Sequence, residues 1–121
     1  MSHCCYILEE ATGPREDRCS YVGYSTNAER RLRQHNRVTS RGAAQTAHCR
    51  WIISAIITGF KDRHEALSFE ANQQSRTVRD IMRRMVCVRT TLGCRRWQHL
   101  TLNDVSKCDF FSIHSVAHNR K

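Results

Sequence analysis

Five side chains within the first 70 residues have the types that hydrolysis of a phosphodiester bond requires: Tyr6, Tyr21, Arg31, His35 and Glu70. The reaction needs a nucleophilic water, a group that accepts its proton, and positive charge beside the phosphate as negative charge develops. Glu70 can hold one hard divalent cation, Mg²⁺ or Mn²⁺, with water in the other positions. Arg31 can contact the scissile phosphate. Tyr6, Tyr21 and His35 are all candidates for the proton transfer, and the sequence does not choose among them.

The two phenols need electrostatic help to act as bases. An isolated phenol has a pKa of about 10, so it accepts a proton at neutral pH only beside a cation. Arg31 and the metal ion are the predicted source of that charge. His35 can tune a tyrosine or act as the base itself.

Each of these residues also has an ordinary structural role. A strand tyrosine usually packs, a helix arginine is usually solvated, and a glutamate is usually a surface charge. Glu70 differs because it lies beside an apolar helix stripe, where an unpaired charge would be costly. The combination of the five residues, more than any one of them, favours a catalytic site.

Two strands are predicted to carry the tyrosines. Residues 3–8 and 19–25 are strand-like and are separated by a polar stretch, residues 9–18, that contains a Gly-Pro pair. We expect a hairpin with a long loop. Tyr6 and Tyr21 would then lie on paired strands.

A helix after the second strand is predicted to present the cations. Thr26 followed by Glu29 fits a capping box, which predicts a helix over residues 27–37. Arg31 and His35 are four residues apart and therefore share one face of this helix.

A third strand is predicted over residues 50–58. Its run "WIISAII" is apolar on both faces, which indicates a strand covered by helices on each side. The small, polar residues 38–49 before it read as a loop. A last strand is expected at residues 109–116.

Two further helices follow the third strand. Asp62 with Glu65 repeats the capping signature and predicts a helix over residues 62–75, with these side chains pointing inward: Ala66, Leu67 and Phe69. A second helix is expected from Arg76, with an apolar stripe at these positions: Val78, Ile81, Met82 and Met85.

The predicted fold class is α/β, with a small central antiparallel sheet of three or more strands flanked by helices. A chain of 121 residues is about the size of one domain. We therefore expect a single domain over residues 1–121, with a core at about 3–75 that carries the motifs and a C-terminal helix and extension at about 76–121.

The charge of the chain favours a polyanionic partner. The formal net charge is +9, and arginine dominates the 20 basic residues. The planar guanidinium suits phosphate oxygens, so nucleic acid is the leading candidate, although a merely soluble basic protein would have the same charge. Arg30, Arg33 and Arg41 are predicted to contact DNA backbone phosphates. Gly23 is predicted to let the substrate approach the backbone closely.

The cysteines indicate a reducing compartment. There are seven, without the paired spacing of a zinc ribbon or finger, and we expect reduced, mostly buried thiols. Cys4, Cys5 and Cys19 are predicted to be core thiols. No signal peptide pattern or bilayer-length apolar run is seen, so the expected protein is intracellular and soluble.

The order of these motifs resembles the GIY-YIG nuclease domain. The first motif reads Cys4-Cys5-Tyr6 and the second Tyr21-Val22-Gly23, followed by the arginine, the histidine and the glutamate described above. Within that family the chain is most similar to the branch that cuts branched DNA as the catalytic subunit beside a scaffold protein. That similarity covers about residues 5–74 and runs through these segments: "CYIL", "YVGYSTNAERRLRQHN", "RGAAQT", "CRW", "GF" and "ALSFE".

The resemblance implies a metal-dependent, structure-selective endonuclease that acts on branched or flapped DNA in repair, recombination or viral DNA processing, in the nucleus or at a site of viral DNA replication. The branch usually carries a C-terminal RING-type zinc domain, for which the C-terminal cysteines lack the paired spacing. This weighs against a scaffold partnership that depends on that domain and favours a stand-alone enzyme of the kind that large DNA viruses encode.

Two alternatives remain on sequence grounds. A non-catalytic basic nucleic-acid-binding module would need the arginines but not Glu70. A homing or restriction nuclease would need an appended domain for reading bases, which the 121 residues do not show.

Overall fold

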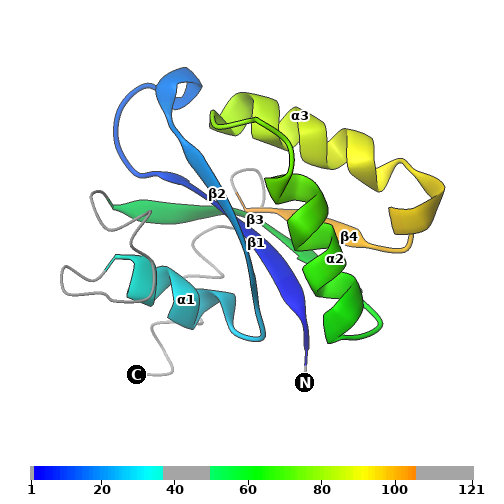
Figure 1. Ribbon diagram of the computed structural model, residues 1–121. Helices are drawn as coiled ribbons and strands as arrows, with labels where there is room; N and C mark the ends of the chain where they lie inside the picture. The colour runs from blue at the N-terminus through cyan, green and yellow to red at the C-terminus, as the bar shows by residue number, and fades with distance from the viewer. Residues whose placement is uncertain (1, 37–49, 106–121) are drawn as a thin grey trace.

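A four-stranded antiparallel sheet forms the centre of the molecule (Figure 1). The structure, a computed structural model, describes residues 2–36 and 50–105. The strand order across the sheet is β2-β1-β3-β4. The strands span β1 Cys4–Glu10, β2 Ser20–Ser25, β3 Trp51–Thr58 and β4 Thr101–Asp104. The predicted α/β class with an antiparallel sheet is confirmed.

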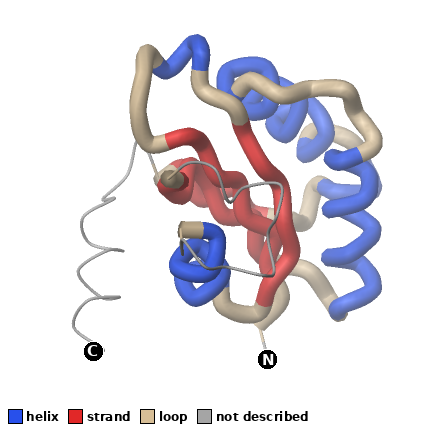
Figure 2. Tube along the Cα trace, turned by 60° about the vertical axis from the view of Figure 1, so that its left-hand side comes forward, coloured by secondary structure: helices blue, strands red, loops and turns tan. Residues whose placement is uncertain are grey.

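Helices cover both faces of this sheet, as Figure 2 shows. They span α1 Ala28–His35, α2 Arg63–Gln74 and α3 Ile81–Leu92, with two short 3-10 turns, η1 Arg15–Asp17 and η3 Arg95–Trp97. Successive side chains of a strand point to opposite faces. Accordingly, Cys5 and Ile7 of β1 pack with α2 and α3, whereas Tyr6 and Leu8 pack with α1. The prediction that residues 50–58 are covered on both sides is confirmed by β3, which contributes to both core clusters.

A buried ion pair closes the long hairpin between β1 and β2. Glu9 is only 2% exposed, and its carboxylate accepts from Arg18 Nη1 at 2.7 Å and from Arg15 Nε at 3.3 Å. The loop that was expected to be simply polar is therefore tied to β1 by charge. This holds the two strands in the register that pairs Tyr6 with Gly23.

Helix α1 is capped by Asn27, and the capping box predicted at Thr26 is wrong. The Asn27 side chain accepts from Arg30 N at 3.0 Å, so the helix begins one residue later than the box predicts. Glu29 instead pairs with Arg33 one turn on. The helix ends at His35, and Arg37 lies outside the described residues.

Helix α2 begins where the sequence predicts it. The Asp62 side chain accepts from Glu65 N at 2.8 Å. Ala66 and Phe69 are fully buried as predicted, whereas Leu67 is partly buried.

Helix α3 starts five residues later than expected. The residues just before it bond instead to the chain at the start of β2: Ser20 N donates to Arg79 O at 2.6 Å, and Ile81 N donates to Arg18 O at 2.9 Å. Asp80 then caps the helix by accepting from Arg83 N.

The inward face of α3 also differs from the predicted stripe. Ile81 and Met85 are buried as expected, but Val78 precedes the helix and Met82 is 47% exposed. Strand β4 has no counterpart among the predicted strands. The loop expected at residues 38–49 and the strand expected at 109–116 lie outside the described residues.

The cysteines in the described segments are less buried than expected. Cys4 and Cys5 are core residues, whereas Cys19 is exposed, so its prediction as a core thiol is wrong. Cys19 lies at the exposed end of the hairpin loop, where it bridges to Asp80. All five cysteines in the described segments are free thiols. In the same segments, no helix is long and apolar enough to cross a membrane.

Candidate active site

Tyr6 lies at the centre of the site, on the face of the sheet that α1 covers. It is 1% exposed and pairs across the hairpin with Gly23. A Cβ atom at Gly23 would lie 2.3 Å from Tyr6 Oη, far inside contact distance. The structural reason for glycine at this position is therefore room for the Tyr6 ring. Substrate approach at Gly23, which the sequence suggested, remains a prediction.

Two side chains of α1 bond to the Tyr6 hydroxyl. Tyr6 Oη lies 3.0 Å from His35 Nε2, and Arg31 Nε donates to Tyr6 Oη at 3.4 Å. Arg31 can only donate, so the hydroxyl accepts on that side. In its bond with His35 the hydroxyl donates when the imidazole is protonated on Nδ1 and accepts when it is protonated on Nε2.

Tyr21 completes a cluster of three rings and one guanidinium. Its ring centroid lies 4.8 Å from that of His35 and 6.4 Å from that of Tyr6. Tyr21 is half-buried, whereas His35 is 1% exposed. We call Tyr6, Tyr21, Arg31 and His35 the tyrosine–histidine cluster. These four predicted residues are brought together by the fold.

Burial sets the protonation states in this cluster. It raises the pKa of Tyr6 to about 12, although Arg31 acts in the opposite direction. It also raises the pKa of Tyr21, and the charge of Glu70 adds to that rise. Burial, followed by the charge of Arg31, lowers the pKa of His35 to about 4. Both phenols are therefore protonated and His35 is neutral at pH 7. Arg31 lowers the pKa of Tyr6, the direction that was expected of it, but in the protein without a metal ion desolvation outweighs this effect.

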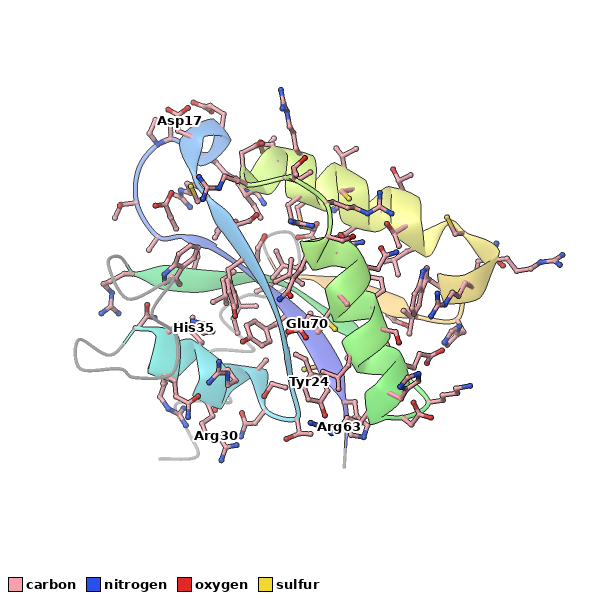
Figure 3. The ribbon with its side chains drawn as sticks, viewed as in Figure 1. Asp17, Tyr24, Arg30, His35, Arg63 and Glu70 are labelled. Atoms are coloured by element: carbon pink, nitrogen blue, oxygen red, sulfur yellow. The ribbon has the colours of Figure 1, made fainter. Side chains whose placement is uncertain are left out.

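Glu70 reaches the cluster around the edge of the sheet. It belongs to α2, which covers the opposite face from α1, but β2 is an edge strand and α2 docks along it. The backbone N–H of Tyr24 hydrogen-bonds to the Glu70 carboxylate, and one turn later Gln74 Nε2 donates to Val22 O at 2.9 Å. Figure 3 shows Glu70 between α2 and β2, with His35 on α1.

The charge of Glu70 acts electrostatically on the tyrosines of the cluster. Burial raises the pKa of Glu70, while the Tyr24 N–H and Arg31 lower it. In return, Glu70 contributes to the raised pKa of both Tyr6 and Tyr21. A half-buried carboxylate that makes no ion pair within the described residues fits a hard cation. In residues 2–36 and 50–105, no group of three or more His, Cys, Asp and Glu side chains could hold a metal ion.

Two of the predicted DNA contacts, Arg30 and Arg33, lie on the exposed side of α1. Arg30 is exposed there, and Arg33 is exposed while pairing with Glu29 at 3.3 Å. Arg41 lies outside the described residues. The role of these arginines in DNA binding remains a prediction.

Sequence reasoning gave no role to four polar neighbours of the site. Gln34 accepts from Arg31 Nη1, and the Tyr24 hydroxyl bonds His3 Nδ1 at 2.8 Å. Gln74 anchors α2 to β2, as described above. Helical spacing could have found Gln34, three residues after Arg31. The pairing of His3 with Tyr24 depends on strand register and had no local signal.

Comparison with known proteins identifies the family. The family model described as "GIY-YIG catalytic domain" matches residues 2–83. The chain belongs to the GIY-YIG family. The resemblance seen in the sequence is therefore confirmed, and the cluster and Glu70 all fall within the matched residues.

Three relatives are known as structure-specific endonuclease subunits. The chain is 35% identical to "Structure-specific endonuclease subunit slx1" of Schizosaccharomyces pombe over 84% of its own length and 40% of that protein. Two "Structure-specific endonuclease subunit SLX1 homolog" proteins are also similar. The one from Cryptosporidium parvum is 41% identical over 58% of this chain and 16% of the relative. The one from Leishmania major is 33% identical over 90% of this chain and 16% of the relative. The GIY-YIG chain thus spans less than half the length of these relatives.

Proposed function

We propose that this GIY-YIG chain is a metal-dependent endonuclease that hydrolyses phosphodiester bonds in branched or flapped DNA. The observation that carries the proposal is the position of Tyr6 Oη, which is hydrogen-bonded to both Arg31 and neutral His35. Glu70 lies near enough for its charge to raise the pKa of both Tyr6 and Tyr21. A purely structural tyrosine does not need this set of partners. The names of the three relatives support an endonuclease that is specific for structure.

Tyr6 relays the proton of the attacking water. Its pKa of about 12 makes the phenol a poor base by itself, but with His35 protonated on Nδ1 the phenol donates its hydrogen to His35 Nε2, 3.0 Å away. As the Tyr6 oxygen accepts a proton from water, its own proton moves to His35. The imidazolium that results is disfavoured by burial and favoured by the negative charge that develops on the phosphate.

Arg31 has two tasks in this scheme. Its Nε–H donates to Tyr6 Oη and stabilises any negative charge on that oxygen. The rest of the guanidinium, which also donates to Gln34, supplies positive charge to the phosphate. Tyr21 is half-buried beside His35 and is the second candidate for contact with the water or the phosphate.

Glu70 holds the divalent cation. Its carboxylate is fixed by the Tyr24 N–H at the outer edge of β2. When bound, Mg²⁺ or Mn²⁺ would polarise the phosphate and neutralise charge on the departing 3′ oxygen. With a single carboxylate ligand, most of the coordination shell stays available to water and phosphate oxygens.

The basic surface binds the DNA backbone, with Arg30, Arg33 and Arg41 as phosphate contacts. The relatives are named as subunits, and we propose that this chain also works with a protein partner. Its place of action would be the nucleus or a site of viral DNA replication.

Cleavage assays on linear, flapped and four-way DNA, with Mg²⁺, Mn²⁺ or EDTA, test this function. We expect cutting of branched DNA only with a divalent cation. Glu70→Gln, which keeps the shape but removes the charge, should abolish cleavage while DNA affinity stays near wild type. Full activity of that variant, or activity in EDTA, would refute the metal role of Glu70. A protein that binds branched DNA but never cuts it would support the non-catalytic binding module instead.

A further inference from the structure

A second basic site lies beside the start of β2, the strand that carries Tyr21. A cavity of about 570 Å³ opens between the start of β2, the end of α2 and the segment that leads into α3. Its lining includes Tyr21 and three arginines: Arg76, Arg79 and Arg84. No carboxylate is among the lining residues. We call this the arginine cavity.

Arg84 is a buried cation without a counter-ion in the described part of the chain. It is 5% exposed, and its Nη atoms donate to carbonyl oxygens of Gln73 at 2.8 Å and Val78 at 2.8 Å. Its Nε atom is buried and has no hydrogen-bond partner among the described residues. These bonds explain why the side chain lies there, but carbonyl dipoles do not neutralise its charge. Removing a cation from water without pairing it is costly.

The neighbouring arginines increase this cost. Arg76 and Arg79 are exposed at the same cavity. Burial lowers the pKa of Arg84, and the charge of Arg76 lowers it further. The nearest acidic side chain in sequence, Asp80, is committed to capping α3 and faces Arg83. An anion in the cavity would relieve the repulsion between Arg76 and Arg84.

The position of the cavity indicates which anion it binds. Tyr21 belongs both to the cavity and to the tyrosine–histidine cluster, so the two sites adjoin along β2. Ser20 donates to Arg79 O from both its backbone N and its Oγ, which fixes the basic segment against the start of the strand. A nucleic-acid strand that crosses the cluster at Tyr21 therefore comes next to the arginine cavity. Guanidinium groups bind phosphate oxygens in a bidentate manner.

We propose that the arginine cavity binds a backbone phosphate of the DNA whose scissile phosphate occupies the tyrosine–histidine cluster. The inference rests on the proposed endonuclease function and adds a second contact on the same substrate. Arg76 and Arg79 meet the phosphate from the rim, and Arg84 supplies charge from the base. The substrate is then held on both sides of the reacting bond, by the arginines of α1 and by those between α2 and α3.

The test is the salt dependence of DNA binding, measured by fluorescence anisotropy on four-way DNA in EDTA so that no cleavage occurs. Arg76→Gln and Arg79→Gln should each weaken binding and reduce the slope of log affinity against log salt by about one unit. The matched control is Arg95→Gln, which removes the same charge from an exposed position in η3, beyond the far end of α3. It should leave the slope unchanged. Slopes of Arg76→Gln and Arg79→Gln equal to that of Arg95→Gln would overturn the proposal.

Arg84 is tested in the wild-type protein, because its substitution could unfold the α2–α3 connection. With ¹⁵N-labelled arginine, the Arg84 Nε–H resonance should shift as four-way DNA is added, and an unchanged resonance would exclude Arg84 from the site. Failure of the proposed function is recognised separately. If Arg76→Gln and Arg79→Gln show the reduced slopes but the wild-type protein never cuts DNA, the arginine cavity binds DNA and only the nuclease function is wrong. If the wild-type protein cuts DNA but the two variants keep its slope, only the arginine cavity is wrong.

Discussion

Replacing Gly23 by alanine should displace Tyr6 and so disable the site, although every reacting group is still present. The new Cβ would lie 2.3 Å from Tyr6 Oη and 2.4 Å from Cζ, whereas ordinary contact begins at 3.4 Å. The ring must therefore move by about 1 Å. Overpacking of this kind typically costs about 1–3 kcal/mol of stability. A shift of that size also stretches the 3.0 Å bond to His35 beyond hydrogen-bond range.

The expected effect on catalysis is larger than the effect on stability. A misplacement of about 1 Å in a reacting group can lower the rate roughly a hundredfold. Single-turnover cleavage of four-way DNA at saturating enzyme measures the rate, and urea denaturation measures the free energy of unfolding. Gly93→Ala is the matched control. Gly93 lies at the end of α3 with an ordinary φ of −77°, and a Cβ there would lie 3.3 Å from Thr90 O. That variant should keep the wild-type rate.

A double-mutant cycle tests whether Gly23 acts through the hydroxyl. Tyr6→Phe removes the atom that a Cβ at Gly23 would meet first and should itself lower the rate roughly a hundredfold. Adding Gly23→Ala to Tyr6→Phe should then lower the cleavage rate little further, because the two changes remove the same function. A wild-type rate in folded Gly23→Ala protein, or rate losses that multiply in the double variant, would refute this account.

Two further predictions concern stability. The pKa of His35 is lowered to about 4 from 6.5, so the unfolded chain binds a proton that the folded protein does not. The free energy of unfolding should therefore fall as pH drops from 6.5 to 4, by on the order of 3 kcal/mol more in the wild type than in His35→Gln. Urea denaturation at several pH values measures this difference. The same pH dependence in both proteins would contradict the prediction. Glu9→Gln, at the buried pair with Arg18, should cost about 1–3 kcal/mol in the same assay, whereas Glu29→Gln, at the exposed pair with Arg33, should cost less than about 1 kcal/mol. Equal losses in these two variants would show that burial of Glu9 does not matter.

The sequence predicted the elements whose signals are local. The two strands of the hairpin, the helix that carries Arg31 and His35, and the helix that Asp62 caps all follow from patterns within a few residues. The errors at helix starts have specific causes. Thr26 and Asn27 are both good capping residues, and only the backbone conformation decides that Asn27 caps α1. Helical spacing from Val78 onward is real, but residues before Asp80 pair with the hairpin instead.

Other features of the site depend on contacts between distant segments. That Glu70 reaches Tyr6 and Tyr21 depends on β2 being an edge strand, and strand order has no local signature. The raised pKa of Tyr6 depends on burial by α1. Residue types alone do not show this burial, so they overestimate how far Arg31 lowers the pKa of Tyr6. The arginine cavity forms where the α2–α3 connection meets Ser20, which are more than 50 residues apart along the chain.

The edge of β2 also explains why a glutamate stands at position 70 and a glutamine at position 74. Val22 offers a carbonyl oxygen along the outer edge and Tyr24 offers an N–H, two residues further on. The amide of Gln74 can donate to the carbonyl, whereas a carboxylate there would face it with like partial charge. The carboxylate of Glu70 can accept from the N–H, and that bond favours its ionised form against the effect of burial. The hydrogen bond from the Tyr24 N–H therefore keeps the Glu70 carboxylate negatively charged beside the two phenols. A divalent cation requires such a charge.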